Sequence, residues 1–190
     1  MRKSDIISNL LGDILLPLMG FLFWDWGFYF ILLFFLLDQL ARVAFLPLRL
    51  KKLQVKPSTV NQFFFRGFVW FSVELVIVHF CVYLQQPSVD FQHEITAFWT
   101  YEEIGFQQGW LLVPLLVLNE WMRITQEEKQ SLPHAYRVAV LQKQQVNAYL
   151  RMGFFAVANG LLVFVKLPEA ALTVGFLGFL TLLVFYPKVK

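Results

Sequence analysis

Six long apolar stretches, separated by polar segments, constrain the fold of this chain more than any other feature of its sequence. A helix needs about 20 apolar residues to cross a hydrocarbon core roughly 30 Å thick. The stretches that meet or approach this length lie at about 6–23, 28–46, 67–84, 104–122, 149–165 and 170–186. The sequence therefore predicts a single all-α domain, a polytopic transmembrane helix bundle with six spans.

The composition supports this class of protein. Apolar residues make up 58% of the chain and charged residues only 15%, whereas a soluble domain carries about 25% charged residues. The single cysteine, Cys81, cannot form an internal disulfide or supply a cysteine-based metal site. We therefore expect a protein of the lipid bilayer with no metal and no other cofactor.

The distribution of basic residues predicts how the bundle is oriented. If the N-terminus is cytoplasmic, the inner segments hold all but one of the 16 Lys and Arg residues, and only Lys166 lies outside. Membrane proteins gather Lys and Arg in their cytoplasmic loops. We therefore expect both termini in the cytoplasm. The same bias accounts for the net charge of +3 without nucleic acid as a partner.

The first stretch is the weakest of the six, because Asn9, Asp13 and Pro17 interrupt it. No small-x-small cleavage site follows it, so we expect it to stay in the protein rather than act as a cleaved signal peptide. A re-entrant first helix, which would leave five spans, is the alternative.

The connections between the stretches carry recognisable signals. Residues 24–27 predict an interfacial turn, because indole rings favour the headgroup zone, and the second span is expected to end before Pro47. Residues 85–103 predict a polar, acidic loop, and Lys166 to Glu169 a short turn. A helix is expected to begin near Pro133 and to continue into the fifth span, since proline is well placed at a helix start.

Two carboxyl groups and an amide are expected at one depth near the middle of the bilayer. The helical rise places Asp38 and Glu74 about 15 Å from the outer ends of their spans, and Asn159 near the middle of its span. No basic residue is predicted in this layer, although Arg42 lies one turn from Asp38 and can reach toward it. Ionisable groups at this depth are candidate functional residues. They predict helix-to-helix hydrogen bonds, a proton or cation site, or a polar contact to a substrate.

A second polar layer is expected nearer the cytoplasm. Its members fall within about two helical turns of the inner boundary, and they are Asp13, Arg42, Asn119, Glu120 and Arg123. Arginines and carboxylates can neutralise one another there, with the arginine stems reaching toward the headgroups. This layer predicts a structural ion-pair cluster or, alternatively, a site for an anion or a lipid headgroup.

Other candidate chemical groups are sparse. His79 is the only histidine expected within a span, and it favours a structural hydrogen bond over ligation. The acidic outer loop matches no metal-binding spacing, and the chain has no G-x-S-x-G elbow, P-loop or G-x-G-x-x-G motif. No complete catalytic set is therefore predicted.

Short patterns along the chain resemble those of a known group of proteins. They are Asn9 and Leu16-Pro17-Leu18 with Gly20 and Trp26, then Val78-His79-Phe80, then Pro133-x-x-Tyr136-Arg137-Val138-x-Val140-Leu141. In these the chain resembles an uncharacterised bacterial six-span integral-membrane family, known as a domain of unknown function. It departs from that pattern late in the second span. The family is expected to have an acidic-amide pair there, for which this chain offers Asp38-Gln39. The resemblance implies the six-span architecture and a bacterial inner membrane, and it implies no chemistry.

Three functions are compatible with these patterns. The first is a non-catalytic accessory or scaffold component of a membrane complex, with other membrane subunits or further copies of the chain as partners. The second is a small proton- or cation-coupled carrier that uses Asp38, Glu74 and Asn159. The third is a membrane enzyme acting on a lipid or quinone, with His79 or the outer-loop acids as chemical groups.

Overall fold

Seven α-helices form the described part of the chain, which comprises residues 14–52, 57–100, 102, 109–129 and 134–185 of a computed structural model. The helices are α2 (Leu16–Phe23), α3 (Phe28–Lys52), α4 (Pro57–Gln85), α5 (Phe91–Thr100), α6 (Gly109–Lys129), α7 (His134–Phe164) and α8 (Glu169–Phe185). The all-α prediction is confirmed.

Three of these helices are long and apolar enough to cross a membrane. They are Phe28–Lys52, Pro57–Gln85 and the segment Val146–Phe164 of α7. A shorter apolar helical segment covers Glu169–Leu183. Many large apolar side chains point away from the bundle, and Phe164, at 86% exposure, is an extreme case. An exposed apolar surface of this extent is typical of a protein that contacts lipid or other protein.

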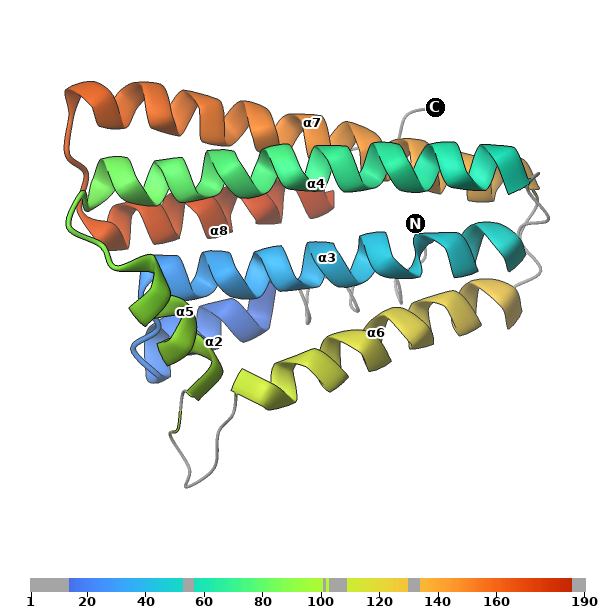
Figure 1. Cartoon of the computed structure of the whole chain (residues 1–190), viewed down its shortest axis with the longest axis horizontal. Helices are drawn as coiled ribbons and strands as arrows, with labels where there is room; N and C mark the ends of the chain where they lie inside the picture. The colour runs from blue at the N-terminus through green and yellow to red at the C-terminus, as the bar shows by residue number, and fades with distance from the viewer. Residues whose placement is uncertain (1–13, 53–56, 101, 103–108, 130–133, 186–190) are drawn as a thin grey trace.

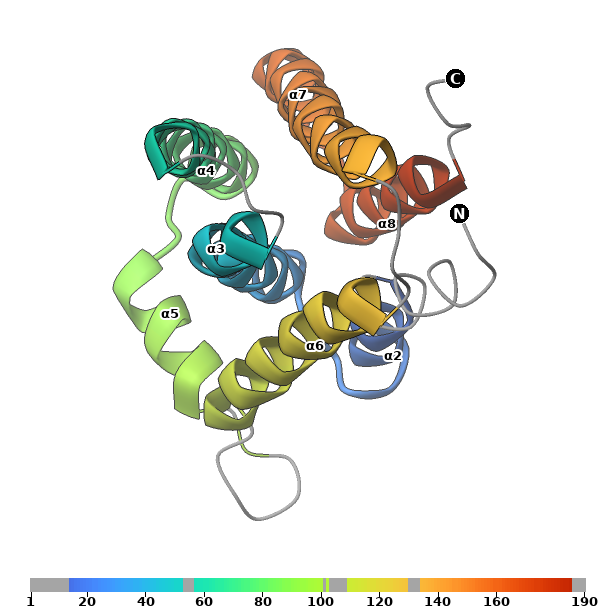
Figure 2. The same cartoon turned by 90° about the vertical axis from the view of Figure 1, so that its right-hand side faces the viewer.

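The helix α3 lies at the centre of the bundle, with α4, α5, α6, α2 and α8 packed around it (Figure 2). Its sequence before Asp38 is rich in Phe, Leu and Ile and is apolar on every face, as expected of a helix segment that is enclosed by others. Ile31 and Leu32 are completely buried. Phe35 packs edge-on against Phe176 of α8 at a ring-centroid distance of 5.2 Å, so the central helix holds the outer ones together.

The long helices alternate in direction, which gives the bundle two different ends (Figure 1). One end, called here the basic end, holds the last turns of α3 and α6 and the first turns of α4 and α7, with Arg49, Lys51 and Lys52 at the end of α3. The other, called here the aromatic end, holds the turn before α3 together with α5. Trp24 and Trp26 lie in that turn, and Trp99 of α5 is 5.1 Å from Trp110 between ring centroids.

The turn between α2 and α3 is confirmed at residues 24–27, and it depends on a glycine. The backbone N–H groups of Trp24 and Trp26 both donate to the carbonyl oxygen of Gly20. A Cβ atom on Gly20 would lie 2.1 Å from Cε3 of the Trp26 ring, so no larger residue fits without movement. Asp25 has a positive φ of 51°, the conformation that reverses the chain here.

The starts of α3 and α8 are joined at the aromatic end. The Glu169 carboxylate accepts a hydrogen bond from the backbone N–H of Phe28, one of the N–H groups that lack a partner within α3. Gly27 permits this approach, because its Cβ position lies 2.9 Å from the Glu169 Oε1 atom. The predicted short turn before Glu169 is therefore present, and it also caps a neighbouring helix.

The helix α3 does not end before Pro47, which corrects the sequence prediction. It continues to Lys52 with Pro47 inside it. The turns beyond the proline are held by packing, since Leu50 is 1% exposed and lies in a small apolar cluster with Val60 of α4. Burial of these side chains offsets the one hydrogen bond that proline cannot donate.

The prediction of a loop over residues 85–103 was also wrong in part, because α5 forms within it. Asp90 starts this helix, and its Oδ1 atom accepts hydrogen bonds from the N–H groups of Gln92 and His93. Phe98 is buried, with its ring 4.7 Å from that of Phe30. The amphipathic face of α5 therefore closes the aromatic end. At the other end, the expected helix after Pro133 is confirmed as α7.

Candidate functional site

The side chain of Arg151 crosses from α7 to a carboxylate on α4 in the interior of the bundle. Its Nε atom lies 2.7 Å from Oε1 of Glu74, and its Nη2 atom lies 3.2 Å from Oε2. The side chains are 10% and 3% exposed. Such two-point contacts suit the planar guanidinium fork and are among the stronger hydrogen bonds in proteins.

A second ion pair lies within α3. The Nε atom of Arg42 is 2.8 Å from Oδ2 of Asp38, one helical turn away. The predicted reach of Arg42 toward Asp38 along the helix face is confirmed. Each of the two predicted deep carboxylates therefore has an arginine of its own.

Gln39 connects the two ion pairs. Its Nε2 group donates to Oδ2 of Asp38 over 3.2 Å, and its Oε1 atom accepts from Nη2 of Arg151 over 3.1 Å. Only this orientation of the amide satisfies both neighbours, because a flipped amide would place its oxygen against a carboxylate and its NH₂ group against a guanidinium. The result is a continuous polar network across three helices, formed by Asp38, Gln39, Arg42, Glu74 and Arg151.

Arg151 was not predicted as a member of this layer. The fifth span was predicted to start at residue 149, which placed Arg151 among the inner basic residues. The helix α7 in fact begins at His134, and Arg151 lies roughly 20 Å along it from the end at Phe164 by the helical rise. The expected helix start at Pro133 could have indicated this position, because a helix that begins there makes Arg151 a mid-helix residue.

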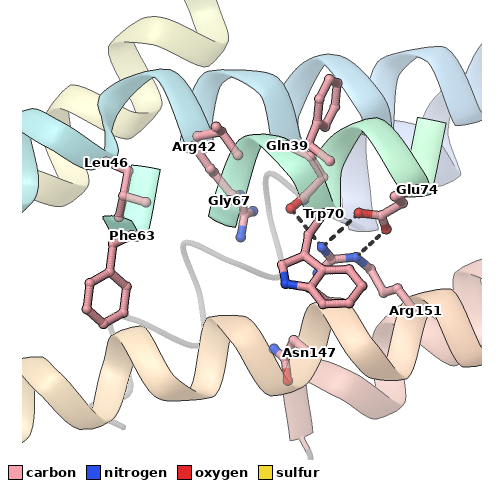
Figure 3. Close-up of a pocket in the computed structure, with 12 residues that line it drawn as sticks. Gln39, Arg42, Leu46, Phe63, Gly67, Trp70, Glu74, Asn147 and Arg151 are labelled. Carbon is pink, nitrogen blue, oxygen red and sulfur yellow. Dashed lines mark hydrogen bonds and ion pairs between the residues drawn. The ribbon is translucent and has the colours of Figure 1, made fainter. Parts of the chain in front are cut away.

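A cavity of about 120 Å³ adjoins the network on the side of the basic end. Figure 3 shows Arg42, Glu74 and Arg151 at this cavity, with Asn147 projecting toward it from α7. Trp70 forms part of the wall and is itself held edge-on by Tyr149 at 5.0 Å between ring centroids. The cavity is partly open to its surroundings.

The lining changes from polar to apolar along the bundle axis. The polar groups come from the deep part, where α3, α4 and α7 share the network. Toward the basic end the lining is mostly apolar, with Val43, Leu46, Phe63 and Gly67, and Asn147 adds one amide from α7. The cavity is therefore a short apolar passage with a charged floor.

The structure does not gather Asp38, Glu74 and Asn159 around this cavity. Glu74 lines it, whereas Asp38 and Asn159 do not. The Asn159 amide donates to the backbone carbonyl of Ile77 over 3.2 Å, and its buried Oδ1 atom has no partner within the described residues. Asn159 thus joins α7 to α4 at a separate point.

The residues of the predicted inner layer form two hydrogen-bonded pairs in the described structure. Arg42 bonds Asp38 in the deep network, and the buried Glu120 accepts from Arg123 over 3.4 Å within α6. Asn119 is partly exposed on the same helix. Asp13 lies outside the described residues.

Both ring nitrogens of His79 are engaged. Its Nδ1 atom lies 2.8 Å from the carbonyl oxygen of Leu75, and its Nε2 atom lies 2.9 Å from the hydroxyl of Tyr29. A carbonyl can only accept, so Nδ1 carries the proton and Nε2 accepts from tyrosine. This arrangement ties α4 to α3. Within the described residues, no group of three or more His, Cys, Asp or Glu side chains is placed to hold a metal ion.

No protein-family model, curated protein or solved structure matches this chain.

Proposed function

We propose that this protein is a six-span, non-catalytic integral-membrane protein that acts as an accessory or scaffold component of a membrane complex. The polar network of Asp38, Gln39, Arg42, Glu74 and Arg151 is the observation that carries the proposal. Its carboxylates are already paired with arginines inside one chain. Paired charges of this kind join helices within one chain, which favours a structural role for the network.

The orientation that we propose places the basic end in the cytoplasm, as the positive-inside rule favours. Both termini then lie inside, and α5 with Trp99 lies at the outer surface. The bacterial inner membrane and the six-span family follow from the sequence patterns alone and belong to the same proposal.

Cysteine labelling tests the orientation. Cys81 is buried in α4, so Cys81→Ser provides a background without an accessible thiol. Single cysteines at Lys52 and at Lys166 are then treated in intact cells with a reagent that does not cross the membrane. We expect labelling at position 166 and protection at position 52. Labelling at both positions, or at 52 alone, contradicts the proposal.

Co-purification tests the accessory role. The full chain is extracted in mild detergent from its native membrane, and associated subunits are quantified by mass spectrometry. Stoichiometric partners support the proposal, and their loss in Asp38→Asn or Glu74→Gln links the network to assembly. Purification of a lone chain with full stability contradicts it.

The cavity is the one observation that favours the carrier alternative. A carrier predicts solute or proton flux in proteoliposomes that Glu74→Gln abolishes while the protein stays folded. Asp38 and Asn159 do not line the cavity, so a carrier would depend on Glu74 and Arg151 rather than on the predicted trio.

A further inference from the structure

We infer that the cavity between α3, α4 and α7 binds a small organic carboxylate with an apolar body, carboxylate first, from the basic end. The carboxylate would contact Arg151 at the deep floor, and the apolar body would lie between Leu46, Phe63 and Trp70.

The donor groups at the floor point to an anion. A guanidinium carries five N–H donors and no acceptor. Arg151 uses Nε and Nη2 for Glu74 and Gln39, and its Nη1 group has no hydrogen-bond partner within the described residues. This group is not enclosed by the protein, so an oxygen acceptor of a ligand in the cavity can reach it.

The charge of the lining points the same way. Arg42 and Arg151 line the cavity together with one acid, Glu74, whereas Asp38 lies behind Arg42 and does not. The Glu74 side chain is only 3% exposed, and both of its carboxylate oxygens contact Arg151. A ligand entering the cavity meets two guanidinium groups and one carboxylate, with Asp38 balancing the charge of Arg42.

The shape of the cavity selects the rest of the ligand. Val43, Leu46, Phe63 and Gly67 form an apolar passage, and an apolar body there is removed from water. The small volume, about 120 Å³, suits a compact ring or short chain rather than a whole lipid. A lipid anchored with its headgroup at the basic end would place its apolar tail at the charged floor. This mismatch also disfavours a lipid as the ligand.

Binding of 4-fluorobenzoate tests this inference. The protein is placed in nanodiscs of zwitterionic phosphatidylcholine, and ligand binding is followed by fluorine NMR line broadening, with empty nanodiscs to correct for partitioning into lipid. We expect saturable binding of 4-fluorobenzoate at neutral pH. Binding of 4-fluorobenzyl alcohol and of 4-fluorobenzylamine should be at least about tenfold weaker, since they lack the charge-assisted hydrogen bonds to arginine.

Two glycine variants separate the cavity from nonspecific effects. Gly67→Leu fills the apolar passage and leaves all five network residues in place, and we expect it to abolish saturable binding. Gly153→Leu is the matched control, because nothing lies within 4 Å of a Cβ atom on Gly153, and it should bind as the unmodified protein does. Arg151→Lys keeps a positive charge beside Glu74 but removes the Nη1 donor, and it should weaken binding about tenfold.

Three results would overturn the inference. They are equal binding of the alcohol, unchanged binding in Gly67→Leu, and the absence of saturable binding in the unmodified protein. Competition by inorganic phosphate as strong as that by benzoate would also overturn it, because phosphate has no apolar body.

Discussion

At the scale of single residues, the interior of this bundle depends on polar side chains that each form hydrogen bonds to two different partners. Gln39 donates to Asp38 and accepts from Arg151, and His79 contacts both Tyr29 and the backbone of its own helix. In a medium of low dielectric constant, such a group stabilises the structure only while every partner is present.

Replacing Gln39 tests this dependence. Gln39→Leu removes a hydrogen-bond partner from both Asp38 and Arg151, and we expect a loss of about 1–3 kcal/mol in the free energy of unfolding. Unfolding in mixed micelles with increasing denaturing detergent measures the loss. Gln62→Leu makes the same substitution at an exposed position of α4 and should leave stability nearly unchanged. Equal effects of the two variants would mean that the bridging amide contributes nothing.

The Glu74–Arg151 pair predicts a non-additive result. Removing one partner strands a buried charge and typically costs about 3–5 kcal/mol, whereas replacing both can cost far less. We therefore expect Glu74→Met and Arg151→Met each to be strongly destabilising and the double variant to be more stable than either. The same detergent titration measures all three. Additive losses in the double variant would show that the two side chains do not interact.

At the scale of elements, the parts of the fold that local sequence patterns determine could be predicted. The parts that depend on contacts between distant residues could not. The apolar runs and Pro133 indicated where α3, α4 and α7 lie, because such patterns are local. The end of α3 and the whole of α5 depend on contacts with distant residues, Leu50 with Val60 and Phe98 with Phe30. The pairing of Arg151 depends on distant residues in the same way, since its partners Glu74 and Gln39 lie on two other helices.

The turn between α2 and α3 gives a prediction at this scale. Gly20→Ala places a methyl group where the Trp26 ring lies, and overpacking of this kind costs about 1–3 kcal/mol. Gly178→Ala on α8 is the control, with nothing within 4 Å of the new atom, and there alanine should be neutral or stabilising because it favours helix. Thermal unfolding monitored by circular dichroism in detergent should show a lower midpoint for Gly20→Ala and an unchanged or higher midpoint for Gly178→Ala.

At the scale of the whole molecule, the two ends of the bundle differ in chemistry. The basic end carries Arg49, Lys51 and Lys52 where α3 finishes, and the aromatic end carries the tryptophan turn and α5. This polarity is a property of the assembled bundle and does not depend on any one contact.

Charge reversal at the basic end tests whether this polarity sets orientation. Lys51→Glu together with Lys52→Glu removes two positive charges beside the second predicted span, and we expect a mixed or inverted population. Reporter fusions at the C-terminus measure the fraction in each orientation. Reversal of the exposed acids Asp90→Lys and Glu102→Lys should act in the same direction, by adding positive charge to the other side. An unchanged orientation in both variants would contradict the proposed topology.

The contacts of Arg151 with Glu74 and Gln39 also limit how far α7 can slide past its neighbours. A shift of one helical turn in either direction would bring Asn147 or Phe155 to the place of Arg151. Glu74 would then lose its counter-charge, and an isolated carboxylate in an apolar interior is unfavourable by several kcal/mol. Matching polar atoms therefore contribute to the stagger of the three longest helices, and a shift of α7 by one turn is unfavourable.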